Sequence, residues 1–169
     1  MSNQDVFKYC PRCSKTARLA DSRKIDCPNC GFKLYLNTAA AVAAMIFDAD
    51  GRLMFIRRNH DPQKGLLDLP GGFVDFNEDG ETALRREVFE ELGINLETVE
   101  YYRSIPNVYN YAGVLYHTLD IFFTCRAKNQ PSVKPNDEIM EIVYKFPKDV
   151  SEDEIAFDSM KKLIPNFPL

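Results

Sequence analysis

A group of acidic residues near the middle of this 169-residue chain has the spacing of a metal site. Glu87 stands three and four residues before Glu90 and Glu91, so in a helix the three carboxylates share one flank. Like charges at this spacing repel one another unless a cation relieves them. Hard oxygen ligands in this number suit Mg²⁺ or Mn²⁺, which also bridge phosphate oxygens. The pattern therefore indicates metal-dependent phosphate chemistry.

The residues around these acids predict a helix that seats them on a core. Asp79 is a good N-cap residue ahead of the acidic segment. Leu84, Val88 and Leu92 follow the i, i+4, i+8 spacing of an apolar stripe. We expect one flank of the helix to pack while the other carries the carboxylates.

Paired glycines precede the expected helix. Gly71 and Gly72 interrupt a short apolar run, at a point where the backbone can turn sharply and approach an ion or ligand closely. An acid-rich amphipathic helix is usually only a solvated surface helix. That explanation accounts neither for the paired glycines nor for Arg86 at its spacing.

The spacing resembles the signature of the Nudix hydrolases. The matching string is Gly72, five residues, Glu78, seven residues, Arg86-Glu87-Val88, one residue, Glu90-Glu91, one residue, Gly93-Ile94. Every defined position of the signature is met. The resemblance covers about 39–164 and implies an α+β fold, an α/β/α sandwich around a mixed sheet. It also implies hydrolysis of a nucleoside diphosphate linked to another group X.

The resemblance further implies roles for single residues. The ligands of catalytic Mg²⁺ would be the carbonyl of Gly71 and the carboxylates of Glu87, Glu90 and Glu91. Arg86 would orient Glu87. The general base varies within the family, and we rank Glu87 first and Glu138 second. Glu138 ends a polar turn, 135–138, before an expected strand, although an ordinary loop acid explains it equally well.

Four cysteines near the N-terminus form a second strong pattern. Two CxxC pairs stand thirteen residues apart, a separation typical of a zinc ribbon with four thiolate ligands: Cys10, Cys13, Cys27 and Cys30. A redox CxxC motif normally occurs only once in a chain. A framework of disulfide bonds is typical of exported proteins, and the first ten residues, MSNQDVFKYC, do not have the pattern of an export signal. We expect structural Zn²⁺ and a reduced, cytoplasmic location. Cys125, in an apolar run, is expected to be a small buried strand residue.

Length and composition limit the remaining possibilities. A chain of this length with 45% hydrophobic residues can form one hydrophobic core and a small module stabilised by a metal. We expect the metal-stabilised module at 1–37 and the larger domain at 38–169. No stretch reaches the length of an apolar membrane span. The net charge of −4 offers no general attraction to nucleic acid or membrane. Expected strands are 39–47, 52–58, 99–104, 115–126 and 139–146, with a last helix from Ser151 or Asp158 to Leu163.

The substrate is harder to read than the reaction. A four-cysteine ribbon with this signature is similar to NADH pyrophosphatases and to a related group acting on FAD and ADP-ribose. The NADH enzymes carry Ser-Gln-Pro-Trp-Pro-Phe-Pro, whereas this chain has no Trp and reads SIPNVYNY over 104–111. We therefore favour ADP-ribose or a related adenine dinucleotide. Tyr109 and Tyr111 are candidates to stack on a base, and Arg57 and Arg58 to bind phosphate, although packing and solvated roles are more common.

Two other classes of protein stay open. The ribbon is locally basic, which would suit a nucleic-acid-binding or nucleotide-sensing regulator: Lys8, Arg12, Lys15, Arg18, Arg23, Lys24 and Lys33. An intact acid set would be an odd feature of a pure binder. A hydrolase of capped RNA ends that uses the ribbon to hold the strand is the third class. We expect a small-molecule substrate and no nucleic-acid or membrane partner, and family members often form homodimers.

Overall fold

The computed structural model describes residues 6–19, 21, 23–131 and 138–167, which form two compact units. One unit contains the N-terminal segment up to Thr38 together with Val108–His117. The other contains Ala39–Asn107 and Thr118–Leu169. The division into domains at residues 37 and 38 remains our proposal, since residues 108–117 group with the first unit. No helix of the described chain is both long and apolar enough to cross a membrane.

The N-terminal segment folds as a small three-stranded sheet. Its strands are β1 (Arg18–Leu19), β2 (Lys24–Asp26) and β3 (Lys33–Tyr35), which pair antiparallel in the order β1-β2-β3. Ile25 and Ala17 are buried with two of the cysteines in a very small core. A core of this size is marginal by itself, so a bound metal would have to supply much of the stability.

The larger unit is built on two sheets. In the first, order β7-β4-β9-β8, β4 runs parallel to β9 and antiparallel to β7, so the sheet is mixed. Its strands are β4 (Ala39–Ile46), β7 (Gly71–Phe73), β8 (Leu96–Tyr111) and β9 (Val114–Ala127). The second sheet, order β10-β5-β6, is antiparallel and contains β5 (Leu53–Arg58), β6 (Leu67–Asp68) and β10 (Ile139–Lys145).

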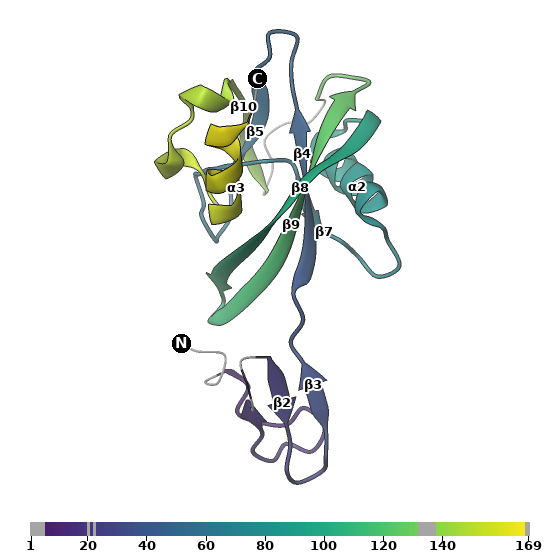
Figure 1. The fold of residues 1–169 in the computed structure, drawn as a ribbon, viewed down its shortest axis with the longest axis vertical. Helices are drawn as coiled ribbons and strands as arrows, with labels where there is room; N and C mark the ends of the chain where they lie inside the picture. The colour runs from purple at the N-terminus through teal and green to yellow at the C-terminus, as the bar shows by residue number, and fades with distance from the viewer. Residues whose placement is uncertain (1–5, 20, 22, 132–137, 168–169) are drawn as a thin grey trace. The chain divides into compact units, whose positions relative to one another are not determined.

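Helices cover both faces of these sheets (Figure 1). Val42 and Ala44 of β4 pack in one core with α2 (Gly80–Leu92), while Met45 packs in a second core with α3 (Asp158–Leu163). Alternate strand residues thus face opposite layers, as the pleat requires. Short 3₁₀ turns flank α3: Pro147–Asp149, Glu152–Glu154 and Ile164–Asn166. The predicted α/β/α sandwich with a mixed sheet is confirmed.

Most predicted elements lie within a residue or two of their observed bounds, with one exception. β8 continues to Tyr111, whereas the sequence suggested an end at Ser104. Pro106 would interrupt a central strand because it lacks an N–H donor, but β8 lies at the sheet edge, where that loss is tolerated. Of the two alternatives for the last helix, Asp158 is the observed start, and Ser151 instead caps a 3₁₀ turn.

Candidate active site and metal centre

Local sequence explains why α2 forms where it does. The Asp79 side chain accepts a hydrogen bond from the N–H of Thr82 at 2.8 Å, which caps the first turn. Gly93 ends the helix with a φ of 64°, a left-handed conformation that favours glycine. Leu84, Val88 and Leu92 are fully buried, which confirms the predicted apolar stripe. The acidic flank is thereby turned away from the core.

The paired glycines allow β7 to lie against both β4 and α2. Gly71 has a φ of 149°, and a Cβ there would lie 2.0 Å from the carbonyl oxygen of Val42. A Cβ on Gly72 would lie 2.5 Å from Cδ of Glu87. Both separations are far below van der Waals contact. A side chain at Gly72 would therefore displace the carboxylate that the signature places at its centre.

Arg86 holds the acidic flank together. Its guanidinium donates to both carboxylate oxygens of Glu78 at 2.9 and 2.8 Å and to Glu87 at 2.9 Å. It also donates to Glu90 at 3.3 Å and to the carbonyl of Phe73 at 3.1 Å. The hydrogen bonds from Arg86 hold the pKa of Glu78 below its ordinary value. The sequence proposed the Arg86 to Glu87 contact, but it assigned no partner to Glu78.

Glu91 is part-buried and is held by a backbone hydrogen bond. Its carboxylate accepts a hydrogen bond from the Gly71 N–H at 2.9 Å. Burial raises its pKa well above the ordinary value, and the negative charges of Asp68, Glu87 and Glu138 act in the same direction. Burial also raises the pKa of Glu87. Ionising these acids together is costly unless a cation is present.

The donor set fits a hard divalent cation. Three carboxylates and the Gly71 carbonyl offer the oxygen ligands that Mg²⁺ and Mn²⁺ prefer. Arg86 forms ion pairs with Glu87 and Glu90. The carboxylate oxygens of Glu87, Glu90 and Glu91 do not all lie within 4.8 Å of one another, whereas the four cysteine sulfurs of the described chain do. The assignment of Gly71, Glu87, Glu90 and Glu91 as the residues that would hold Mg²⁺ stays a prediction.

The raised pKa of Glu91 predicts a pH effect on the metal-free protein. A buried acid whose folded pKa is raised contributes stability at low pH, which is lost as pH rises through the folded pKa. We expect the free energy of unfolding of wild type to fall relative to Glu91→Gln as pH rises above 4.5. Urea denaturation at several pH values, after removal of divalent ions, measures this difference. Glu81→Gln, exposed on the same helix, should follow wild type.

Arg58 and Asp68 form a part-buried ion pair. Arg58 donates to Asp68 at 2.7 Å and to the carbonyl of Pro62 at 2.9 Å, and it lies 5.0 Å from the Phe157 ring centroid. Burial raises the pKa of Asp68 despite this partner. Sequence reasoning missed Asp68, an acid inside the apolar run Leu66 to Leu69, which was the available signal.

The other residues that the sequence suggested as substrate contacts already have partners within the protein. Arg57 pairs with Glu141 and donates to the carbonyl of Gly65 at 2.9 Å. Tyr109 stacks on Tyr116 with ring centroids 5.8 Å apart, and Tyr111 is 6.4 Å from the same ring. The phosphate-binding and base-stacking roles of Arg57, Arg58, Tyr109 and Tyr111 stay predictions.

Glu138 lies close enough to Glu91 for its charge to raise the Glu91 pKa. Its backbone carbonyl accepts a hydrogen bond from Asn59 N–H at 2.9 Å. Residues 135–137 of the predicted polar turn lie outside the described residues. The structure thus brings Glu138 near the acidic group, and its role as a base stays a prediction.

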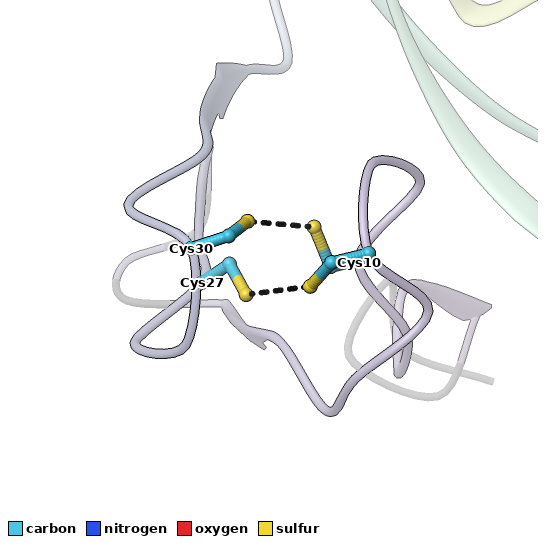
Figure 2. A group of neighbouring side chains, drawn as sticks. Cys10, Cys27 and Cys30 are labelled. Atoms are coloured by element: carbon cyan, nitrogen blue, oxygen red, sulfur yellow. Dashed lines mark hydrogen bonds between the residues drawn. The ribbon is translucent and has the colours of Figure 1, made fainter.

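The four N-terminal cysteines converge on one point (Figure 2). Cys10 and Cys30 sulfurs are 3.7 Å apart, and Cys13 and Cys27 sulfurs are 3.6 Å apart. Disulfide sulfurs would be about 2.05 Å apart. A tetrahedron with Zn–S bonds of about 2.3 Å has edges of about 3.8 Å. The four thiols therefore fit a zinc ion.

Each CxxC pair sits in the same backbone turn. The carbonyls of Cys10 and Cys27 accept from the N–H groups of Ser14 and Gly31, at 2.8 and 3.0 Å. Ser14 and Gly31 both have positive φ, of 59° and 72°. The repeated geometry aims all four sulfurs inward.

Backbone N–H groups lower the pKa values of two cysteine thiols, but to different net effect. The Lys15 N–H lowers the pKa of Cys13 to about 6. The Phe32 N–H acts likewise on Cys30, but burial and the neighbouring thiols outweigh it and raise that pKa to about 12. Thiols this close cannot all ionise without a cation.

With this geometry established, comparison with known proteins identifies the family. The NUDIX domain family model matches residues 37–167, so the chain belongs to the NUDIX family. A MutT NUDIX hydrolase from Burkholderia pseudomallei superposes with a TM-score of 0.61 at 27% identity, covering 69% of this chain and 88% of that one.

Two curated relatives show the range of similarity. NAD-capped RNA hydrolase NudC of Haemophilus influenzae is 32% identical over 103 residues, which is 60% of this chain and 39% of the relative. ADP-ribose pyrophosphatase of Methanocaldococcus jannaschii is 43% identical over 63 residues, 37% of each chain. This chain thus matches about two fifths of the length of these relatives.

Proposed function

We propose that this protein hydrolyses the diphosphate linkage of a nucleoside diphosphate joined to a group X, in a reaction that needs Mg²⁺ or Mn²⁺. Water adds to one phosphorus, the bridging P–O bond breaks, and a nucleoside monophosphate and X-phosphate are released. One observation carries the proposal. Glu91 is part-buried and accepts a hydrogen bond from the Gly71 N–H, and the neighbouring Glu87 accepts one from Arg86.

The chain's own groups provide positioning and charge. A divalent ion, when bound, would lower the pKa of water and neutralise the diphosphate. The hydrogen bond from Gly71 fixes one oxygen of Glu91, and Arg86 fixes one oxygen of Glu87. Both carboxylates keep a second oxygen for a ligand or a proton. Preorganised groups of this kind avoid reorganisation during the reaction.

The general base is proposed to be Glu87, with Glu138 second. Burial raises the pKa of Glu87, which makes its carboxylate a stronger base than an exposed glutamate. Glu138 is exposed but lies within electrostatic reach of Glu91. A Glu138→Gln variant with near-normal turnover would leave Glu87 as the base.

The favoured substrate is ADP-ribose or a related adenine dinucleotide such as NADH or FAD. The 43% identity to an ADP-ribose pyrophosphatase supports this choice, as does the lack of Trp in a segment where NADH enzymes carry one. A panel of nucleoside diphosphate compounds with Mg²⁺, scored for release of nucleoside monophosphate, tests it. No release from any member would refute the hydrolase proposal and favour a nucleotide-sensing regulator.

Hydrolysis of capped RNA ends is the second candidate. It is supported by similarity to a relative named NAD-capped RNA hydrolase. The ratio of kcat/KM for a dinucleotide-capped RNA to that for the free dinucleotide separates the two. A ratio well above one favours the capped RNA. We also propose, from the sequence, that the protein is cytoplasmic and forms a homodimer.

Replacing Arg86 by Ala should lower kcat more than it raises KM. The guanidinium bonds three carboxylates of this site, so its loss disorders catalytic groups while leaving substrate contacts in place. We expect a loss of roughly 10²-fold in kcat, comparable to removal of one preorganised donor. Steady-state kinetics with the preferred substrate measure it.

Arg85→Ala is the matched control for this experiment. Arg85 is the neighbouring arginine on α2, and its guanidinium donates to the backbone carbonyl of Leu96 instead of to an acid. Its replacement should leave kcat near wild type. A pure KM effect in Arg86→Ala would instead make Arg86 a phosphate clamp.

A further inference from the structure

The ribbon sheet has one face turned away from its core. In its register Arg18 lies opposite Asp26, and Asp26 lies opposite Lys33. Lys24 lies opposite Tyr35. Directly opposed residues project from the same face, and every second residue along a strand returns to it. These five residues, Arg18, Lys24, Asp26, Lys33 and Tyr35, therefore form what we call the outer face.

The opposite face carries Leu19, Ile25 and Leu34, of which Leu19 and Ile25 pack while Leu34 is exposed. Ile25 is 1% exposed and, with Leu19, lies in the cluster that contains the cysteines. On the outer face, by contrast, Tyr35 is 57% exposed, and Arg18 and Lys33 are exposed. Lys24 and Asp26 form an ion pair at 3.5 Å, which leaves the charges of Arg18 and Lys33 in excess. The outer face is thus a basic surface with one accessible aromatic ring.

Charge is distributed unevenly along the chain, with the excess of positive charge in the ribbon. Residues 1–38 contain seven Lys or Arg and three Asp or Glu, a formal charge of +4. The whole chain has −4, so residues 39–169 carry −8. The other basic residues described in the ribbon are also exposed: Lys8, Arg12, Lys15 and Arg23. Positive charge is therefore concentrated on a small module of an otherwise acidic protein, which is typical of attraction to a polyanion.

We propose that the outer face of the ribbon binds single-stranded RNA. Arg18 and Lys33 would contact phosphates, and Tyr35 would stack on a base. A positively charged surface with an exposed aromatic ring is how proteins hold single strands, because every unpaired base offers a π face. A duplex hides those faces, whereas proteins that recognise RNA mostly target unpaired bases and stack them on aromatic side chains. This proposal departs from our sequence-based expectation of no nucleic-acid partner and develops the alternative in which the basic ribbon binds nucleic acid.

The test uses the zinc-loaded full chain and an uncapped, unstructured RNA of about 20 nucleotides, a length that exceeds the roughly 4–16 nucleotides of one small binding module. Fluorescence anisotropy over a salt series should show an affinity that falls as salt rises. Lys33→Gln should reduce the slope of log affinity against log salt by about 0.7, the loss of one phosphate contact. Tyr35→Ala should weaken binding about fivefold or more, while Tyr35→Phe keeps the ring and the affinity.

Controls separate this inference from folding and from the proposed function. Lys128→Gln removes an exposed lysine outside residues 1–38 and should bind RNA like wild type. Zinc content reports that each ribbon variant is folded, and ADP-ribose hydrolysis assayed in parallel should be unchanged by Lys33→Gln. Because the RNA has no cap, binding does not depend on hydrolase activity. No RNA binding at low salt, equal affinity for a duplex, or wild-type affinity in both Lys33→Gln and Tyr35→Ala would overturn the inference.

Discussion

Turnover should fall by about 10³-fold or more in Glu91→Gln, with little loss of folding. The amide preserves the shape of the side chain and can still accept a hydrogen bond from the Gly71 N–H, but it removes a part-buried negative charge from the proposed ligand set. Removing that charge also relieves repulsion from Asp68, Glu87 and Glu138. The metal-free variant should therefore be at least as stable as wild type. Initial rates across a Mg²⁺ titration, with thermal unfolding, measure both effects.

Glu81→Gln is the matched control for Glu91→Gln. Glu81 lies in the first turn of the same helix, is exposed, and should give wild-type rates. If Glu91 is a metal ligand that also shapes the site, saturating Mg²⁺ should not restore the turnover of Glu91→Gln. Near-normal turnover in Glu91→Gln would remove Glu91 from the proposed ligand set.

Loss of zinc is the second large effect that we expect. Purified, reduced wild-type protein should contain close to one Zn²⁺ per chain, and moderate EDTA should remove the carboxylate-bound ions first, since thiolates bind zinc more tightly. Cys27→Ser should lose the zinc, because Cys27 is buried and supplies one of the four converging sulfurs. Metal binding and folding are coupled in such a small module. Elemental analysis and limited proteolysis measure the change.

The proteolysis pattern tests the coupling. Residues before Asn37 should become protease-sensitive in Cys27→Ser, while the larger unit, with its own two cores, stays resistant. Cys125→Ser is the control, since Cys125 lies on β9 and outside the cluster, and its zinc content should match wild type. Freshly prepared wild-type protein without zinc would refute the ribbon interpretation.

The sequence by itself predicted the parts of this protein that depend on short-range spacing. Helical periodicity placed Glu87, Glu90 and Glu91 on one flank, because a helix repeats every 3.6 residues whatever surrounds it. The Asp79 cap follows from a local backbone preference. The spacing of the two CxxC pairs predicted a thiolate cluster in the same way. The α/β/α sandwich was expected from the resemblance to the Nudix hydrolases.

The same reasoning failed where neighbours in space determine the outcome. The end of β8 was placed too early, because only the order of strands shows that Pro106 lies in an edge strand. The short strands β6 and β7 carried too few residues for a periodic signal. Asp68 was missed for a related reason, since nothing near it in sequence indicates its pairing with Arg58.

Only the tertiary structure decided how strongly each acid of the site is perturbed. Glu90 and Glu91 are adjacent in sequence, yet Glu90 is exposed while Glu91 is part-buried and accepts from the Gly71 N–H twenty residues away. Burial determines the cost of ionisation, and burial depends on how β7 closes against α2, which no local pattern encodes. The ribbon shows the same limit, because strand register alone places Lys33, Arg18 and Tyr35 on one face.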